Sequence, residues 1–134
     1  MSKIIYTNSD GTVSIITPVG NVNDAIKDVP SGISYEIVDD DKIPTDRTFR
    51  NAWVKGSGVV TEDVTKAKAI AHGTRREKRE VEFKPHDDII AKQIPGKSTS
   101  DAEIARAAIR TKYATMQTNI DNSTTISKIK EALG

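Results

Sequence analysis

The sequence of 134 residues contains no cysteine and few aromatic side chains, which make up 4% of the chain. The lack of cysteine excludes disulfides and thiolate metal sites. The scarcity of aromatic residues predicts a thin, aliphatic core. A thin core in a polar chain favours a homo-oligomer, because a partner can bury what the monomer cannot. The length itself fits one domain, which we predict to cover residues 1–134.

The chain also lacks a charge excess and a long apolar run. Its formal net charge of +1 argues against a nucleic-acid polymer as partner, because neutralising phosphates needs a surplus of lysine and arginine. No apolar run reaches the length that spans a bilayer, so no membrane partner is expected. The first residues enter a strand-like pattern without the features of a secretory signal, which favours a cytoplasmic location.

The first half of the chain has the pattern of β-structure. Asp10-Gly11 lies between two short β-prone runs, residues 3–6 and 13–17, and this dipeptide is a strong hairpin signal. Further strands are expected at residues 34–38 and 49–54, with a short helix at 21–28. In the run at 49–54, Phe49 and Trp53 would share one face.

The second half has the composition of helices. Residues 61–93 show no alternation and are rich in helix formers, with a kink or break expected at Pro85. Ser100 and Glu103 have the spacing of a capping box for a second helix that runs to about residue 120, and a short helix follows at 126–133. The prediction is an α+β protein: a small antiparallel sheet of about four strands in residues 1–58, then two long helices and a short terminal helix in residues 61–134.

Motifs of catalysis and of cofactor binding are missing. The sequence has no nucleophile elbow, no phosphate-cradling glycine loop and no dinucleotide fingerprint. Its two histidines, His72 and His86, do not have metal-ligand spacing on one helix. We therefore predict a protein that is not an enzyme and that has no cofactor, no catalytic residue and no metal site.

Several side chains have both a functional and a structural interpretation. Phe83 is either an anchor between the long helices or a stacking platform for a base. Arg106 and Arg110, four residues apart, either line a groove between the helices or form an ordinary surface pair. Arg47 and Arg50 either bind an anion or pair with the acidic residues 39–41. The charged run at 75–80 is either a solvated helix face or an anion-facing patch.

Two segments carry a resemblance to known proteins. One is residues 43–53 (IPTDRTFRNAW); the other covers residues 82–90 (EFKPHDDII) and 93–96 (QIPG), followed by 107–114 (AAIRTKYA). Together they resemble small proteins of tailed phages. The layout of a small sheet followed by two long helices is similar to the phage anti-Thoeris proteins of the first described type. Those proteins are sponges that bind glycocyclic ADP-ribose, the signal of bacterial TIR enzymes, and hold it uncleaved; related members also hold cyclic oligonucleotides.

The resemblance implies a ligand site between two protomers of a homo-oligomer, a dimer at least and a hexamer as the larger alternative. Phe83 would stack on the adenine and Arg110 would donate to the pyrophosphate, with Gln93 and Arg106 nearby. Arg47 and Arg50 would be outer phosphate contacts. The location implied is the cytoplasm of an infected bacterial host. The alternative function is a virion-associated or tail-fibre assembly protein, and a hydrolase of such nucleotides is disfavoured by the missing catalytic groups.

Overall fold

The computed structural model describes residues 1–134 and confirms the α+β class, with the strands in the first half and the helices in the second. The chain forms two compact units, Met1–Ala67 and Lys68–Gly134. The division falls inside the first long helix and not between residues 58 and 61, where the pattern changes from β to α. That the chain is one domain stays a prediction from its length.

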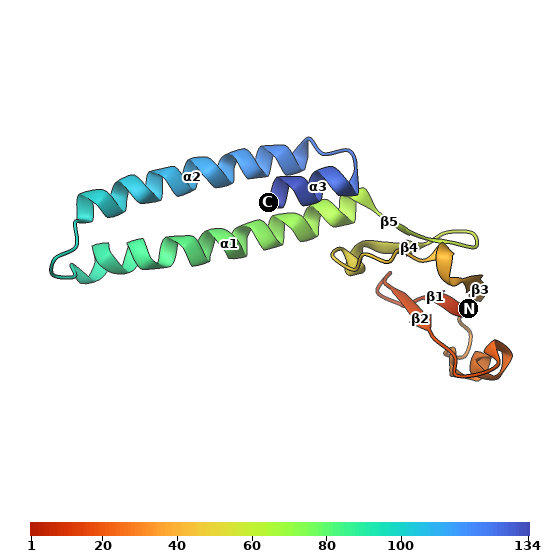
Figure 1. Ribbon diagram of the computed structural model, residues 1–134. Helices are drawn as coiled ribbons and strands as arrows, with labels where there is room; N and C mark the ends of the chain where they lie inside the picture. The colour runs from red at the N-terminus through yellow and green to blue at the C-terminus, as the bar shows by residue number, and fades with distance from the viewer. The chain divides into compact units, whose positions relative to one another are not determined.

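The N-terminal unit contains a three-stranded antiparallel sheet in the order β2–β1–β3 (Figure 1). Its strands are β1 (Ser2–Thr7), β2 (Val13–Ile16) and β3 (Tyr35–Asp39). The predicted hairpin is confirmed: Thr7 pairs with Val13, and Gly11 adopts a φ of 87°, which glycine tolerates without strain. Two 3₁₀ helices follow the strands β2 and β3, namely η1 (Val22–Asp28) and η2 (Asp40–Lys42).

The strand predicted at residues 49–54 is only partly correct. Its first part is a 3₁₀ turn, η3 (Arg50–Ala52), which the Ala52 amide closes by donating to the Phe49 carbonyl at 2.8 Å. The strand β4 (Trp53–Lys55) begins after this turn, so Phe49 and Trp53 do not share a strand face. It pairs with β5 (Val60–Glu62), which was not predicted, and the five strands therefore form two sheets.

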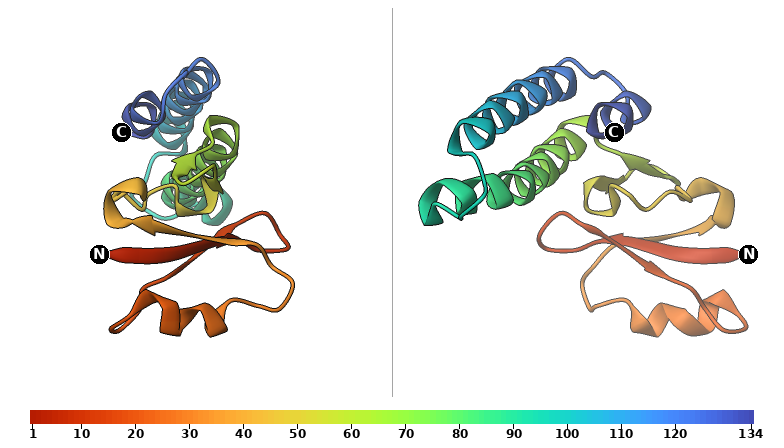
Figure 2. Two further views of the ribbon diagram at one scale, coloured as in Figure 1. Left: turned by 90° about the vertical axis from the view of Figure 1, so that its right-hand side faces the viewer. Right: turned by 60° about the vertical axis from the view of Figure 1, so that its left-hand side comes forward.

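The core of this unit lies between the two sheets. Ile4 and Ile5 are both fully buried although neighbours in a strand point to opposite faces, so both faces of β1 are covered. Figure 2 shows η1, in orange, on one side of β1 and the β4–β5 hairpin on the other. The buried cluster around Ile5 draws residues from both sheets: Val13, Val38, Trp53 and Val60.

The first long helix, α1 (Val64–Lys92), begins directly after Asp63, whose side chain accepts a hydrogen bond from the Lys66 amide at 2.8 Å. Of the kink or break expected at Pro85, the break is wrong, because the helix continues through this residue, and the kink stays a prediction. Proline removes one backbone hydrogen bond, but ion pairs join α1 to the second long helix on both sides of it. These pairs are Glu82–Lys112 at 2.6 Å and Asp87–Arg106 at 2.8 Å.

The second long helix, α2 (Thr99–Asp121), begins at Ser98, whose hydroxyl accepts from the Asp101 amide at 3.1 Å. The expected capping box at Ser100 is therefore two residues too late. The last helix, α3 (Ile126–Leu133), has the predicted bounds and is capped by Thr125. None of the helices combines the length and the apolar character needed to cross a membrane. The buried face of α2 consists of Ala102, Ile109, Tyr113, Met116 and Ile120.

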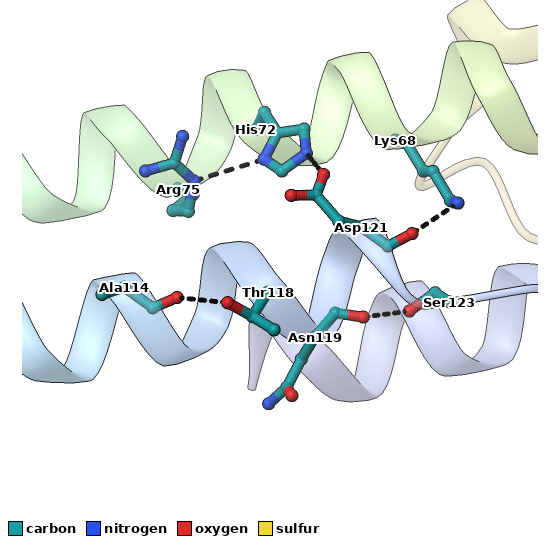
Figure 3. A network of polar contacts seen from close by, with 8 residues as sticks. All are labelled: Lys68, His72, Arg75, Ala114, Thr118, Asn119, Asp121 and Ser123. Carbon is teal, nitrogen blue, oxygen red and sulfur yellow. Dashed lines mark hydrogen bonds and ion pairs between the residues drawn. The ribbon is translucent and has the colours of Figure 1, made fainter.

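A polar network joins α1 to the end of α2 within the helical unit (Figure 3). The Asp121 carboxylate lies 2.8 Å from Nε2 of His72, and the Asp121 carbonyl accepts from Lys68 at 2.9 Å. The guanidinium of Arg75, which is buried, donates from Nε to Nδ1 of His72 at 3.3 Å. Because Nδ1 of His72 accepts the hydrogen bond from Arg75, we assign the ring proton to Nε2, which donates it to the Asp121 carboxylate.

Candidate functional site

Arg106 lies at the edge of the surface that α2 turns toward α1. It follows the buried Ala102 by four residues and precedes the buried Ile109 by three, so it is close to the apolar seam without being part of it. The side chain is accordingly half-buried, with its guanidinium directed at the facing helix. Such a position keeps the aliphatic stem packed and the charged end available.

The ring of Phe83, on α1, meets this guanidinium. The centre of the Arg106 guanidinium lies 5.7 Å from the ring centroid, and that of Arg79, one turn earlier on α1, lies 4.9 Å from it. Phe83 is half-buried. The structure therefore brings two of the predicted site residues together, an aromatic ring and a guanidinium from facing helices, and adds Arg79 to them.

Two carboxylates fix Arg106. Its Nε lies 2.8 Å from Oδ1 of Asp87 on α1, and its Nη1 lies 3.4 Å from Glu103, one turn earlier on α2. Arg106 is thus pre-oriented against the ring. Its charge is already balanced, however, so a further anion would have to be attracted by another cation nearby.

Arg110 is such a cation. It is exposed, lies one turn after Arg106, about 6 Å further along the axis of α2, and forms no hydrogen bond or ion pair. Two ion pairs join the helices, Arg106–Asp87 and Lys112–Glu82. Arg110 lies between these pairs on α2 and Phe83 lies between them on α1, so the two residues are at a similar position along the helical hairpin. An unpaired guanidinium therefore lies at the height of the ring.

Gln93 does not join this cluster within the chain. It directly follows the last residue of α1 and has a φ of 47°, the left-handed conformation in which helices commonly end. Ten residues separate it from Phe83, which corresponds to about 15 Å along the helix axis. Its role as a ligand contact stays a prediction that, within one protomer, has no geometric support.

Arg47 and Arg50 lie in the N-terminal unit, where both guanidiniums stack on Trp53 at 5.6 and 4.5 Å from the ring centroid. Neither forms an ion pair with the acidic residues 39–41. Asp40 instead binds Lys3 at 3.0 Å and the N-terminal amine at 3.4 Å. The two arginines therefore belong to a separate cluster that is built around a tryptophan.

Sequence reasoning missed two participants in these clusters. The sequence pattern gives Trp53 only a place on a strand face with Phe49, whereas its buried ring also contacts both arginines. Arg79 was considered only as part of a charged run. In both cases a local spacing was available as a signal: Arg79 precedes Phe83 by four residues on a helix, and Arg50 precedes Trp53 by three.

The helical unit also contains an apolar groove of about 590 Å³ with charged side chains around it. None of the six residues predicted to bind the ligand (Phe83, Gln93, Arg106, Arg110, Arg47 and Arg50) lines this groove. At its rim the ammonium of Lys112, 2.6 Å from the carboxylate, holds the pKa of Glu82 below its ordinary value of 4.5. The same hydrogen bond raises the pKa of Lys112, and burial raises the pKa of the Tyr113 phenol. The apolar lining is Val81, Tyr113, Met116 and Leu133.

Comparison with protein-family models, with curated proteins and with solved structures finds no significant match. Nor does the structure contain a group of three or more His, Asp or Glu side chains arranged to hold a metal ion. What the clusters offer chemically is recognition: planar guanidinium donors beside aromatic rings. Such donors suit phosphates, and an aromatic face suits a base.

Proposed function

We propose that this chain is a sponge: a binding protein, not an enzyme, that sequesters a cyclic nucleotide immune signal and releases it unchanged. The ligand that its chemistry suits best is a cyclic ADP-ribose isomer such as glycocyclic ADP-ribose, which combines an adenine with a pyrophosphate. The observation that carries the proposal is the contact of Phe83 with the guanidinium of Arg106, beside the unpaired Arg110. A ring for the base and a free cation for the phosphates are thus at one level of the helical hairpin.

The interaction energy of a stacked base with the Phe83 ring is larger than that of Arg79, which now lies over this ring. Arg79, which is exposed, now lies over Phe83, and a cation–π contact at an exposed site contributes roughly 0.5–1 kcal/mol. Stacking of a base on an aromatic side chain contributes roughly 1–3 kcal/mol. A base can therefore replace Arg79 on the ring at a net gain, and the displaced guanidinium stays close enough to add to the positive charge around the ligand.

The biological setting follows from the sequence resemblance to phage anti-Thoeris proteins. In this proposal the protein acts in the cytoplasm of an infected bacterial host, where it blocks TIR-based signalling by lowering the free concentration of the signal. It works as a homo-oligomer, at least a dimer, in which a second protomer supplies further contacts such as Gln93. Sequestration requires complementary surface only, so no catalytic group is needed.

Isothermal titration with glycocyclic ADP-ribose tests the proposal. Phe83→Ala and Arg110→Ala should each weaken binding at least about tenfold, which corresponds to roughly 1.4 kcal/mol. Arg76→Ala is the matched control, because Arg76 is exposed on α1 and contacts neither Phe83 nor Arg106. Mass spectrometry after denaturation should recover the ligand intact, and a linear product would make the protein an enzyme.

A second outcome of the same titration would reject the site. If Phe83→Ala lowers the melting temperature but leaves the affinity unchanged, Phe83 is an anchor between the helices. The alternative function, a virion-associated or tail-fibre assembly protein, then gains weight. It is favoured by one observation: no residue of α1 after Arg75 is fully buried, and Val81 is 72% exposed. Sedimentation analysis without nucleotide would then detect a large assembly.

A further inference from the structure

The N-terminal unit contains a pocket of about 330 Å³ whose wall is unusually rich in positive charge. It lies between the strands β1 and β2 and the segment that leads from η2 to β4. Three cationic side chains and a single carboxylate line it: Lys3, Arg47 and Arg50 against Asp40. The pocket wall therefore carries a surplus of two positive charges.

The carboxylate does not neutralise the arginines. Asp40 is held by Lys3 at 3.0 Å and by the N-terminal amine at 3.4 Å, and these contacts lower the pKa of its carboxyl group, the Lys3 hydrogen bond most. It is therefore ionised at neutral pH and shared between two other cations. The charges of Arg47 and Arg50 remain as the excess at this pocket.

Arg50 is fixed in place without a carboxylate. It donates a short hydrogen bond from Nη2 to the carbonyl of Val13, and its guanidinium lies 4.5 Å from the centroid of the Trp53 ring. Burial, together with the like charge of Arg47, lowers the pKa of Arg50. A half-buried cation beside a second cation is an unfavourable arrangement that a bound anion would relieve.

The tryptophan carries the arginines but offers no stacking surface to a ligand. Trp53 is only 1% exposed, so no base can lie on its ring, and its Nε1, which has no hydrogen-bond partner, is buried as well. The pocket thus offers forked guanidinium donors, which bind acceptor oxygens. This combination selects an oxyanion and gives nothing to a nucleobase.

We propose that this pocket is a phosphate-binding site, in which Arg47 and Arg50 hold a free phosphate or the phosphate of a small ligand. The site is independent of the nucleotide site proposed around Phe83, because every residue that lines it belongs to the N-terminal unit. Arg50, anchored on Val13, positions the anion. Arg47, which is exposed, closes over it.

The fluorescence of Trp53, the only tryptophan of the chain, reports on this site directly. Titration with inorganic phosphate against sodium chloride of equal ionic strength should give a saturable change with a dissociation constant of about 1 mM or tighter. Adenosine should give none, and adenosine 5′-monophosphate should bind about as well as phosphate. A linear, non-saturating response to phosphate, or a change of the Trp53 fluorescence on addition of adenosine, would overturn the proposal.

Variants separate the site from a general charge effect. Arg47→Gln should weaken phosphate binding about tenfold, whereas Arg76→Gln, which removes the same charge from α1, should leave it unchanged. Arg50→Lys keeps the charge but loses the fork, and should weaken binding without unfolding the unit. Phe83→Ala should have no effect, so the phosphate site and the nucleotide site can fail separately. Equal weakening by Arg47→Gln and Arg76→Gln would reduce the effect to unspecific charge and overturn the proposal.

Discussion

The carboxylate of Asp121 lies 2.8 Å from Nε2 of His72 and thereby joins the last residue of α2 to the early part of α1 in the helical unit. The carboxylate is poorly placed with respect to its own helix, because negative charge at a helix C-terminus is unfavourable by roughly 0.3–1 kcal/mol. A hydrogen bond to a charged group contributes roughly 1.5–3 kcal/mol and outweighs this cost. The pair therefore stabilises the hairpin.

Asp121→Ala should accordingly destabilise the helical unit by about 1 kcal/mol, since the lost hydrogen bond is partly offset by the relieved dipole and by the exposure of the carboxylate. Thermal unfolding followed by the helical circular dichroism signal measures the change. Asp41→Ala is the control, because Asp41 is exposed and lies in the N-terminal unit. Equal melting temperatures of Asp121→Ala and the unaltered protein would contradict the assignment.

The second prediction concerns acid. Lys112 lowers the pKa of Glu82 below 4.5, so the Glu82–Lys112 pair stabilises the folded protein at pH values above 4.5. This stabilisation is lost as the pH falls from 4.5 through the lowered pKa, because the unfolded chain binds the proton more tightly. Glu82→Gln should therefore lower the melting temperature at neutral pH but make little difference in strong acid. A melting-temperature difference that is independent of pH would refute the pair as its cause.

The third prediction compares two glycines that both have open space at the position of a Cβ atom. Gly73 lies inside α1, where Gly73→Ala should stabilise the protein by roughly 0.5–1 kcal/mol. Gly96 has a φ of 78° in the turn that the Lys97 amide closes on the Ile94 carbonyl. There Gly96→Ala should destabilise by about 1 kcal/mol, because the left-handed conformation disfavours any other residue. Urea unfolding of both variants measures the opposite signs.

Periodicity and turn chemistry made much of the fold predictable. The Asp10-Gly11 hairpin, the two long helices and the bounds of α3 all follow from local signals that tertiary contacts reinforce. The errors concern elements that only tertiary contacts specify. The strand β5 has three residues and exists because β4 pairs with it, and α1 continues through Pro85, with an ion pair to α2 on either side of it.

The sequence pattern could predict single residues of the candidate site, but not which of them lie close together in the structure. Helical spacing puts Arg106 at the seam, and this is where it meets Phe83. The same spacing separates Gln93 from Phe83 along one helix, so the two can contact one ligand only through a second protomer. The spacing of three residues between Arg50 and Trp53 was a local signal for their contact, whereas the contact of Arg47 with the same ring depends on the 3₁₀ turn Arg50–Ala52, where the sequence pattern predicted a strand.

The lack of any fully buried residue in α1 after Arg75 has a consequence for hydrogen exchange. Amide protons exchange through the smallest opening that exposes them, and the free energy of that opening depends on the buried contacts it breaks. Amides near Arg75 are protected by the core of the helical unit and by the network around His72. Amides between residues 76 and 92 need only a local opening, so α1 should show a protection gradient that falls toward Lys92. A ligand that binds at Phe83 should increase the protection of the amides between residues 76 and 92 and thereby reduce the difference between the two ends of α1.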